Sequence, residues 1–267
     1  MALNNHLYID CSTGIAGDML TSALIDMMND QQRRAFLEKS NNLLSNTKTK
    51  FRKIKKFNLD GTTVDVVTDK NTEEFSKDVH SETISSLKIT SNKIDAINPF
   101  KLIDEFDIND QCKKNIQNIF ELLMKTESFV HNSPDQHSIH FNRIGSIDAL
   151  IDISNICILL NMLDIKEITA SPVNTGYGQV KYNKKVFQVP APATKKLLED
   201  IPNYYSDIYG ELCTPTGISV LKYFSNDFHI LDISNTIIKE IGIGFGQKVF
   251  NHPTFVKCLL VNRRKLA

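Results

Sequence analysis

The chain has 267 residues, of which 41% are apolar, and this is enough to bury the core of one large domain or of two small ones. Basic and acidic residues number 31 each, so no net charge favours a nucleic acid or an anionic membrane as partner. The sequence shows no apolar run of about 18 residues, no signal peptide and no C-x-x-C pair among its five cysteines. We therefore expect a cytoplasmic protein that binds neither nucleic acid nor membrane and keeps its cysteines reduced.

The first half of the chain predicts a strand, two helices and a hairpin. Residues 6–10 are extended and apolar, whereas residues 15–28 repeat apolar side chains at helical spacing, and a second helix follows Asp30. Alternation over residues 50–69 predicts a β-hairpin with its turn at Asp60 and Gly61. Residues 70–133 are polar and helical in pattern, with a long helix at 110–131, and form a candidate helical subdomain.

The second half predicts one central helix and then mainly strands. Residues 146–163 are apolar nearly all round, which is typical of a buried helix. A strand, a loop and a hairpin are expected over 167–190, helices over 191–200 and 214–224, and the last strands over 237–246 and 255–262. The expected fold class is α+β, a sheet packed with helices, in a single domain spanning 1–267.

The stretch CSTGIAGD (residues 11–18) places two glycines between the first strand and the first helix, in a sequence with only 11 glycines. Backbone N–H groups at such a junction attract phosphate, but Asp18 would repel it unless a cation intervened. The loop matches neither known phosphate motif. It therefore predicts either a phosphate or metal-phosphate site, or close packing of helix on strand. Similarly, TPTG (residues 214–217) offers two hydroxyls to a ligand or a simple helix N-cap.

A histidine-bearing segment, residues 131–152, ends in two aspartates four positions apart. Asp148 and Asp152 would stack two like charges on one helix face, an arrangement that a cation or a hydrogen-bond donor would offset. Imidazole together with carboxylate suits a divalent metal such as nickel or zinc. The alternative is that Asp148 lies favourably at a helix N-terminus while the histidines lie in a solvated loop.

Six motifs in one order resemble the LarC family of nickel-insertion proteins, which mature the nickel-pincer nucleotide cofactor of lactate racemase. The resemblance runs from Tyr8 to Leu260. The motifs are IDCSTGIAGDM, VHNSPDQHSIHFNRIGSIDALIDI, SPVNTGYGQVK, VPAPATKKLL, GELCTPTGISVL and GIGFGQKVFNHP.

The resemblance implies a nickel chelatase or cyclometallase of the lyase class. Its substrates would be nickel and pyridinium-3,5-bisthiocarboxylic acid mononucleotide, joined by two nickel-sulfur bonds and one nickel-carbon bond with CTP and a divalent cation, Mg or Mn. Asp18 and Asp148 are the implied catalytic residues, with Asp18 either holding a cation to the phosphates or acting as base. The implied phosphate-binding residues are Gly14, Gly17, Thr214, Thr216 and Gly217. The implied nickel ligands are His131, His140, Asp148 and Asp152.

The sequence also departs from the family pattern. Asn142 and Arg143 stand where the family has a histidine and a glutamate, and only His80 represents the histidine-rich loop of many relatives. Relatives continue into a C-terminal domain, so the implied partners are a separate C-terminal LarC-type polypeptide and the lactate racemase maturation proteins, in an oligomer. Two alternatives remain: a non-catalytic nucleotide-binding scaffold for cofactor maturation, and a metal-dependent phosphate-binding hydrolase.

Overall fold

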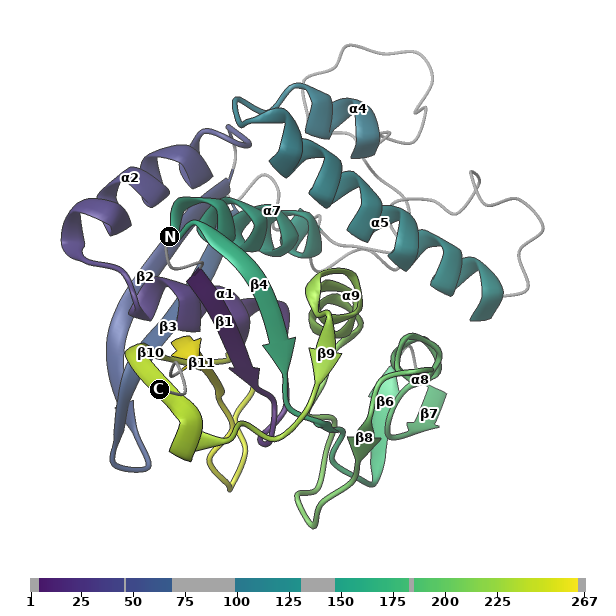
Figure 1. The fold of residues 1–267 in the computed structure, drawn as a ribbon. Coiled ribbons are helices and arrows are strands. Elements are labelled where there is room, and N and C mark those ends of the chain that lie inside the picture. The colour runs from purple at the N-terminus through teal and green to yellow at the C-terminus, as the bar shows by residue number, and fades with distance from the viewer. Residues whose placement is uncertain (1–4, 46, 69–98, 131–146, 183–184, 264–267) are drawn as a thin grey trace, which may run out of the picture.

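The structure is a computed structural model that describes residues 5–45, 47–68, 99–130, 147–182 and 185–263. Its centre is a seven-stranded mixed sheet with the strand order β2, β3, β10, β11, β1, β4, β9, and helices pack against it (Figure 1). The expected α+β class is confirmed. The strands of this sheet are β1 (Asn5–Asp10), β2 (Thr47–Lys56), β3 (Leu59–Thr68), β4 (Ile165–Ala170), β9 (Asp227–Phe228), β10 (Thr236–Phe245) and β11 (Val256–Arg263).

The described helices include all those that the sequence predicted in these segments. They are α1 (Gly17–Asp26), α2 (Asp30–Asn41), α4 (Pro99–Asp104), α5 (Asp110–Val130), α7 (Ile147–Met162), α8 (Pro192–Leu197), α9 (Pro215–Phe224) and the short 3-10 helix η1 (Ile233–Asn235). Two small sheets pair β5 (Val173–Asn174) with β8 (Asn203–Tyr204) and β6 (Gln179–Tyr182) with β7 (Lys185–Gln188). None of the described helices has the length and hydrophobicity needed to cross a bilayer.

Three parallel strands determine at which edge of the sheet three of the helices begin. β1, β4 and β9 run parallel to one another, so their carboxyl ends lie at one edge of the sheet. α1 follows β1, and α7 and α9 precede β4 and β9 along the chain. Because each of these helices packs back against the sheet or its neighbours, all three begin near that same edge. This edge is where ligands bind in sheets of this kind.

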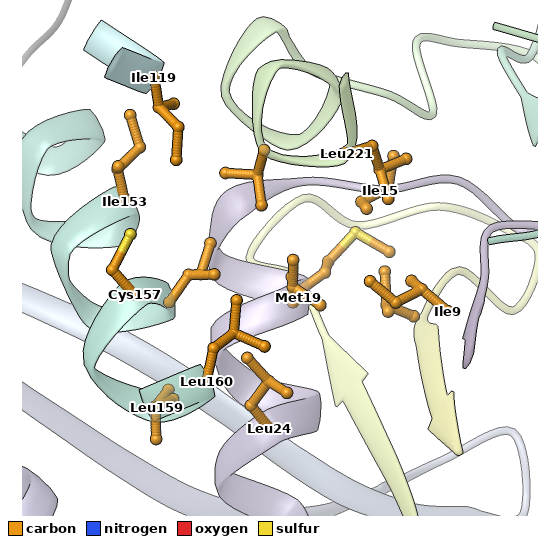
Figure 2. Packing of buried hydrophobic residues seen from close by; sticks show 14 of the residues in the cluster. Ile9, Ile15, Met19, Leu24, Ile119, Ile153, Cys157, Leu159, Leu160 and Leu221 are labelled. Atoms are coloured by element: carbon orange, nitrogen blue, oxygen red, sulfur yellow. The ribbon is translucent and has the colours of Figure 1, made fainter. Parts of the chain in front are cut away.

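α1 lies at the middle of the hydrophobic core. In Figure 2 the Leu24 side chain of α1 lies beside Leu160 of α7, whereas Met19 of α1 points toward Ile9 of β1 and Ile15. α7 is buried on nearly every side, as its sequence predicted, because it lies between α1, α2 and α5. The amphipathic α5 packs on α7, α8 and α9 as an outer layer (Figure 1).

Glycines of β10 allow α1 to approach the sheet closely. A Cβ atom on Gly242 would lie 2.0 Å from the Ala23 carbonyl oxygen, and one on Gly244 would lie 2.0 Å from that of Met19. Both distances are far inside van der Waals contact, so this strand accepts no side chain on its helix-facing side at these positions. The GIGFG stretch therefore forms the surface on which α1 packs.

Asp26 fixes the other end of α1 to the sheet. One carboxylate oxygen accepts hydrogen bonds from Lys53 Nζ at 2.5 Å and from Thr62 Oγ1 at 2.6 Å. The other oxygen accepts one from the Ile243 amide at 3.0 Å. A single side chain at the helix end thus ties together β2, β3 and β10.

Two local predictions were wrong. The hairpin of β2 and β3 turns at Phe57 and Asn58, which take positive φ values of 51° and 62°, whereas Gly61 lies inside β3. Gly61 is needed there because a Cβ atom would lie 2.7 Å from the Ile243 carbonyl oxygen. The first helix begins at Gly17 rather than at Ile15, because Ile15 makes a β-bridge with Cys213. Half of the expected subdomain at 70–133 lies outside the described residues, and the described half, 99–130, includes α4 and α5.

All five cysteines are buried free thiols: Cys11, Cys112, Cys157, Cys213 and Cys258. Burial is the largest cause that raises the pKa of each, and it raises that of Cys213 to about 12. The thiol form therefore dominates at neutral pH.

Candidate functional site at the junction of three helices

The first turn of α1 contacts both α7 and α9. A Cβ atom on Gly17 would lie 2.7 Å from Asp152 Oδ2 of α7 and 3.0 Å from Thr216 Cγ2 of α9. One on Gly217 of α9 would lie 2.8 Å from the Ile15 carbonyl oxygen. The residues expected to hold phosphate and one of those expected to hold metal are therefore neighbours. We call this region the three-helix junction.

The glycine loop has fewer free amides than the sequence suggested. The Gly14 amide donates to the Cys11 carbonyl oxygen at 3.0 Å, and the Ile15 amide donates to that of Leu212 at 2.9 Å. Gly14 has a φ of +104°, and a Cβ atom there would lie 2.2 Å from the Leu212 carbonyl oxygen. The expectation that these two N–H groups are unpaired was wrong, because the segment before α9 packs on the loop. In the first turn of α1 the Met19 amide donates to Asp18 Oδ1, so the amides left to bind an anion are those of Gly17 and Asp18.

Thr214 caps α9. Its hydroxyl oxygen accepts a hydrogen bond from the Gly217 amide at 3.3 Å, so the N-cap alternative is observed. The neighbouring Thr216 places its methyl group toward Gly17. Both hydroxyl groups keep a proton that can be donated to a ligand.

Asp18 is a partly buried carboxylate held in a fixed orientation. Oδ1 accepts a hydrogen bond from the Met19 amide at 2.8 Å, and Oδ2 accepts one from the Gln247 amide at 3.0 Å. Burial raises the pKa of Asp18, whereas these hydrogen bonds and the charge of Lys56 oppose the rise. Lys56 also donates to the carbonyl oxygen of Gly246 at 3.4 Å. Gln247 and Lys56 were not predicted as site residues, since Lys56 lies at the end of β2 and Gln247 in the loop after β10, both far from Asp18 along the chain.

Asp152 is the most perturbed carboxyl group at the junction. Burial, and then the nearby charges of Asp18 and Asp148, raise its pKa well above the ordinary value. Asp148 is exposed in the first turn of α7. Like charges at this spacing attract a proton or a cation.

The nickel-ligand set is only partly visible. His131 and His140 lie outside the described residues, and within the described ranges no group of three or more His, Cys, Asp and Glu side chains converges on one point. Asp18 and Asp152 offer hard oxygen ligands, which suit Mg²⁺ or Mn²⁺ better than a soft ion. A cation held by these two carboxylates would therefore be a hard one.

Asp10 holds the start of the glycine loop. Its Oδ2 pairs with Lys257 Nζ at 2.9 Å, and its Oδ1 accepts a hydrogen bond from the Ser12 amide at 3.0 Å. Burial alone would raise the pKa of Asp10, but Lys257 and Ser12 lower it below the ordinary value. The sequence analysis did not select Asp10, although a polar residue at the end of an apolar strand was a usable signal.

Helix N-termini and carboxylates lie together at the carboxyl ends of β1, β4 and β9. This arrangement is typical of proteins that bind an anionic ligand together with a cation. The chain belongs to the family described as nickel insertion protein, whose model matches residues 7–267. This agrees with the LarC resemblance.

Among curated relatives, proteins from Staphylococcus saprophyticus and Geobacillus kaustophilus bear the name "Pyridinium-3,5-bisthiocarboxylic acid mononucleotide nickel insertion protein". The first is 31% identical over 96% of this chain and 60% of its own length, and the second is 29% identical over 91% and 56%. The chain thus spans about 60% of the length of such relatives. The search of solved structures gave no match.

Proposed function

We propose that the chain is the N-terminal component of a CTP-dependent nickel insertase that makes the nickel-pincer nucleotide cofactor of lactate racemase. The substrates are nickel and pyridinium-3,5-bisthiocarboxylic acid mononucleotide. The observation that carries the proposal is the contact of Gly17 with Asp152 and Thr216, which joins a phosphate-type loop to a carboxylate pair. The names of the relatives support the choice of metal and nucleotide.

The three-helix junction suits the phosphate of the mononucleotide. The Gly17 and Asp18 amides of α1, the Thr216 amide of α9 and the dipoles of both helices favour an anion, because the Met19 and Gly217 amides already donate to side chains and Pro215 has no N–H. Asp18 and Asp152 oppose it unless a cation lies between carboxylate and phosphate. We therefore place a divalent cation, Mg or Mn, between these two side chains and the phosphate groups of a nucleotide, either CTP or the substrate.

Forming a nickel-carbon bond on the ring releases a proton, and a nearby carboxylate must accept it. Asp18 is our candidate base in the alternative in which it does not hold the cation, because two backbone amides fix its orientation and burial raises its pKa. Asp148 is the second candidate, since it is exposed at the start of α7. Nickel delivery from His131, His140, Asp148 and Asp152 remains part of the proposal.

The proposed partners are a C-terminal LarC-type polypeptide and the lactate racemase maturation proteins, in an oligomer in the cytoplasm. The chemistry of the junction supports a second component, because the described carboxylates need further ligands to hold a soft ion.

Lactate racemase activation with purified components tests the proposal. The assay compares this chain, the C-terminal polypeptide and both together, each with nickel, CTP and the pyridinium mononucleotide. We expect activation only by the pair, and loss of it with Gly17→Val, whose side chain would displace Asp152. Full activation by this chain alone would refute the component role, and no activation in any mixture would favour the scaffold alternative.

A further inference from the structure

A group of aromatic rings, two of them exposed, lies on loops that lead along the chain to the three-helix junction. Tyr177 is 43% exposed and Tyr209 is 61% exposed, and their rings meet edge to face with centroids 5.5 Å apart. Lys248 holds its ammonium group 5.0 Å from the centroid of the Phe250 ring. We call Tyr177, Tyr209, Lys248 and Phe250 the aromatic cluster.

Two glycines fix the orientation of these rings. A Cβ atom on Gly178 would lie 2.3 Å from Tyr209 Cε2, and one on Gly210 would lie 2.9 Å from Phe250 Cε1. Both glycines have positive φ, +99° and +116°. The Tyr209 ring thus lies directly against Gly178, and the Phe250 ring against Gly210. Rings held by backbone in this way need little ordering when a ligand arrives.

The chain connects the aromatic cluster to the junction along two routes. Gln247, whose amide donates to Asp18 Oδ2, immediately precedes Lys248 and lies three residues before Phe250. Three residues span at most about 11 Å. On the other route, Tyr209 lies three residues before Leu212, whose carbonyl oxygen accepts the hydrogen bond of the Ile15 amide. Phe250 therefore lies within a short span of chain of Gln247, which contacts Asp18, and Tyr209 lies within a short span of Leu212, which contacts Ile15 just before α1.

We infer that the aromatic cluster is the subsite for the pyridinium ring of the mononucleotide, with its phosphate at the three-helix junction. The inference rests on the proposed function, because it assumes this substrate. A pyridinium ring is cationic and flat, and the negative faces of tyrosine and phenylalanine attract such a ring. The Lys248 ammonium group suits the anionic thiocarboxylate groups on the ring. The pyridinium ring would then contact the aromatic rings, the acid group would contact Lys248, and the phosphate would bind at the three-helix junction.

Isothermal titration calorimetry with nicotinic acid mononucleotide tests this assignment, because that ligand has a pyridinium ring, one carboxylate and one phosphate. Ribose 5-phosphate, which lacks the ring, reports on the junction alone. Tyr209→Ala removes one ring of the cluster and Tyr209→Phe keeps it. Phe129→Ala is the matched control, since Phe129 is 64% exposed on α5 and lies under Lys196 at 4.3 Å in a similar cation–ring pair.

We expect Tyr209→Ala to weaken binding of nicotinic acid mononucleotide about 10-fold, a size typical of losing one stacked ring. Tyr209→Phe and Phe129→Ala should bind like the wild type, and ribose 5-phosphate should bind all four proteins equally. Lys248→Ala should remove any preference for the acid over nicotinamide mononucleotide. Equal binding of nicotinic acid mononucleotide by wild type and Tyr209→Ala would overturn the ring subsite while leaving the phosphate site in place. Failure of both ligands to bind the wild type would overturn the proposed function as well.

Discussion

Replacing Gly244 by alanine tests whether α1 rests directly on β10. The added Cβ atom would lie 2.0 Å from the Met19 carbonyl oxygen and 2.3 Å from the Ala23 amide nitrogen. An ordinary contact is 3.4 Å or more, so helix and strand must separate by about 1.4 Å, the difference between 3.4 and 2.0 Å. Both sides of this contact are backbone, which cannot rotate away. Overpacking of this kind costs about 3 kcal/mol.

Differential scanning calorimetry measures the effect. At about 2–4 °C per kcal/mol for a chain of this size, the melting temperature should fall by about 6–12 °C. Gly246→Ala is the control, because its Cβ atom would meet mainly the flexible end of Met19, with Cγ at 2.9 Å, and should cost less than about 1 kcal/mol. Gly244→Ala should also weaken phosphate binding, since the same helix carries Gly17 and Asp18. A melting temperature for Gly244→Ala within 1 or 2 °C of the wild type, or equal to that of Gly246→Ala, would show that α1 does not rest on this glycine.

Three other outcomes are expected. Asp26→Ala should lower the free energy of unfolding, measured by urea denaturation, by about 3 kcal/mol, because it leaves the Ile243 amide and the Thr62 hydroxyl without an acceptor. Asp26→Asn should lower this free energy by less, and an equal decrease for the two variants would contradict the reasoning. Asp152→Asn should raise the melting temperature at pH 7 but hardly at pH 4. The folded-state pKa of Asp152 lies above its unfolded value, so wild-type stability falls as pH rises between the two, and a pH-independent difference would refute the reasoning. Calorimetry should show a nickel dissociation constant that is micromolar or weaker. Arg143→Glu should tighten nickel binding, since the substitution adds a carboxylate and removes a positive charge. An unchanged affinity would exclude the segment with Asn142 and Arg143 from the metal site.

The elements that depend on local patterns were predictable. α5 follows one apolar face through Ile116, Ile119 and Leu123, and α7 is apolar all round, so the sequence placed both correctly. The hairpin turn was not predictable from Asp60 and Gly61. Asn58 tolerates the left-handed conformation that the turn needs, and the glycine was required by a strand from the other end of the chain.

Much of the candidate site depends on packing between distant segments. The glycine loop and the Asp148/Asp152 face are far apart in the sequence, and only the packing of α1 on α7 shows that Gly17 contacts Asp152. The pairing of Lys257 with Asp10 has no sequence signal, because it depends on the antiparallel register of β1 and β11. The assigned roles of His131 and His140 stay predictions.

The burial of every cysteine bears on how a protein of this family would handle its metal. Nickel has a strong affinity for thiolates, and a thiolate on the protein would act as a sink that traps the ion before it reaches the nucleotide. Cys11 and Cys213 flank the glycine loop and the start of α9, yet both are sealed in the core with raised pKa values. A sealed, protonated thiol is a poor competitor for metal. Under the proposed function, the chain would therefore offer nickel no accessible thiolate of its own that competes with the sulfur atoms of the nucleotide.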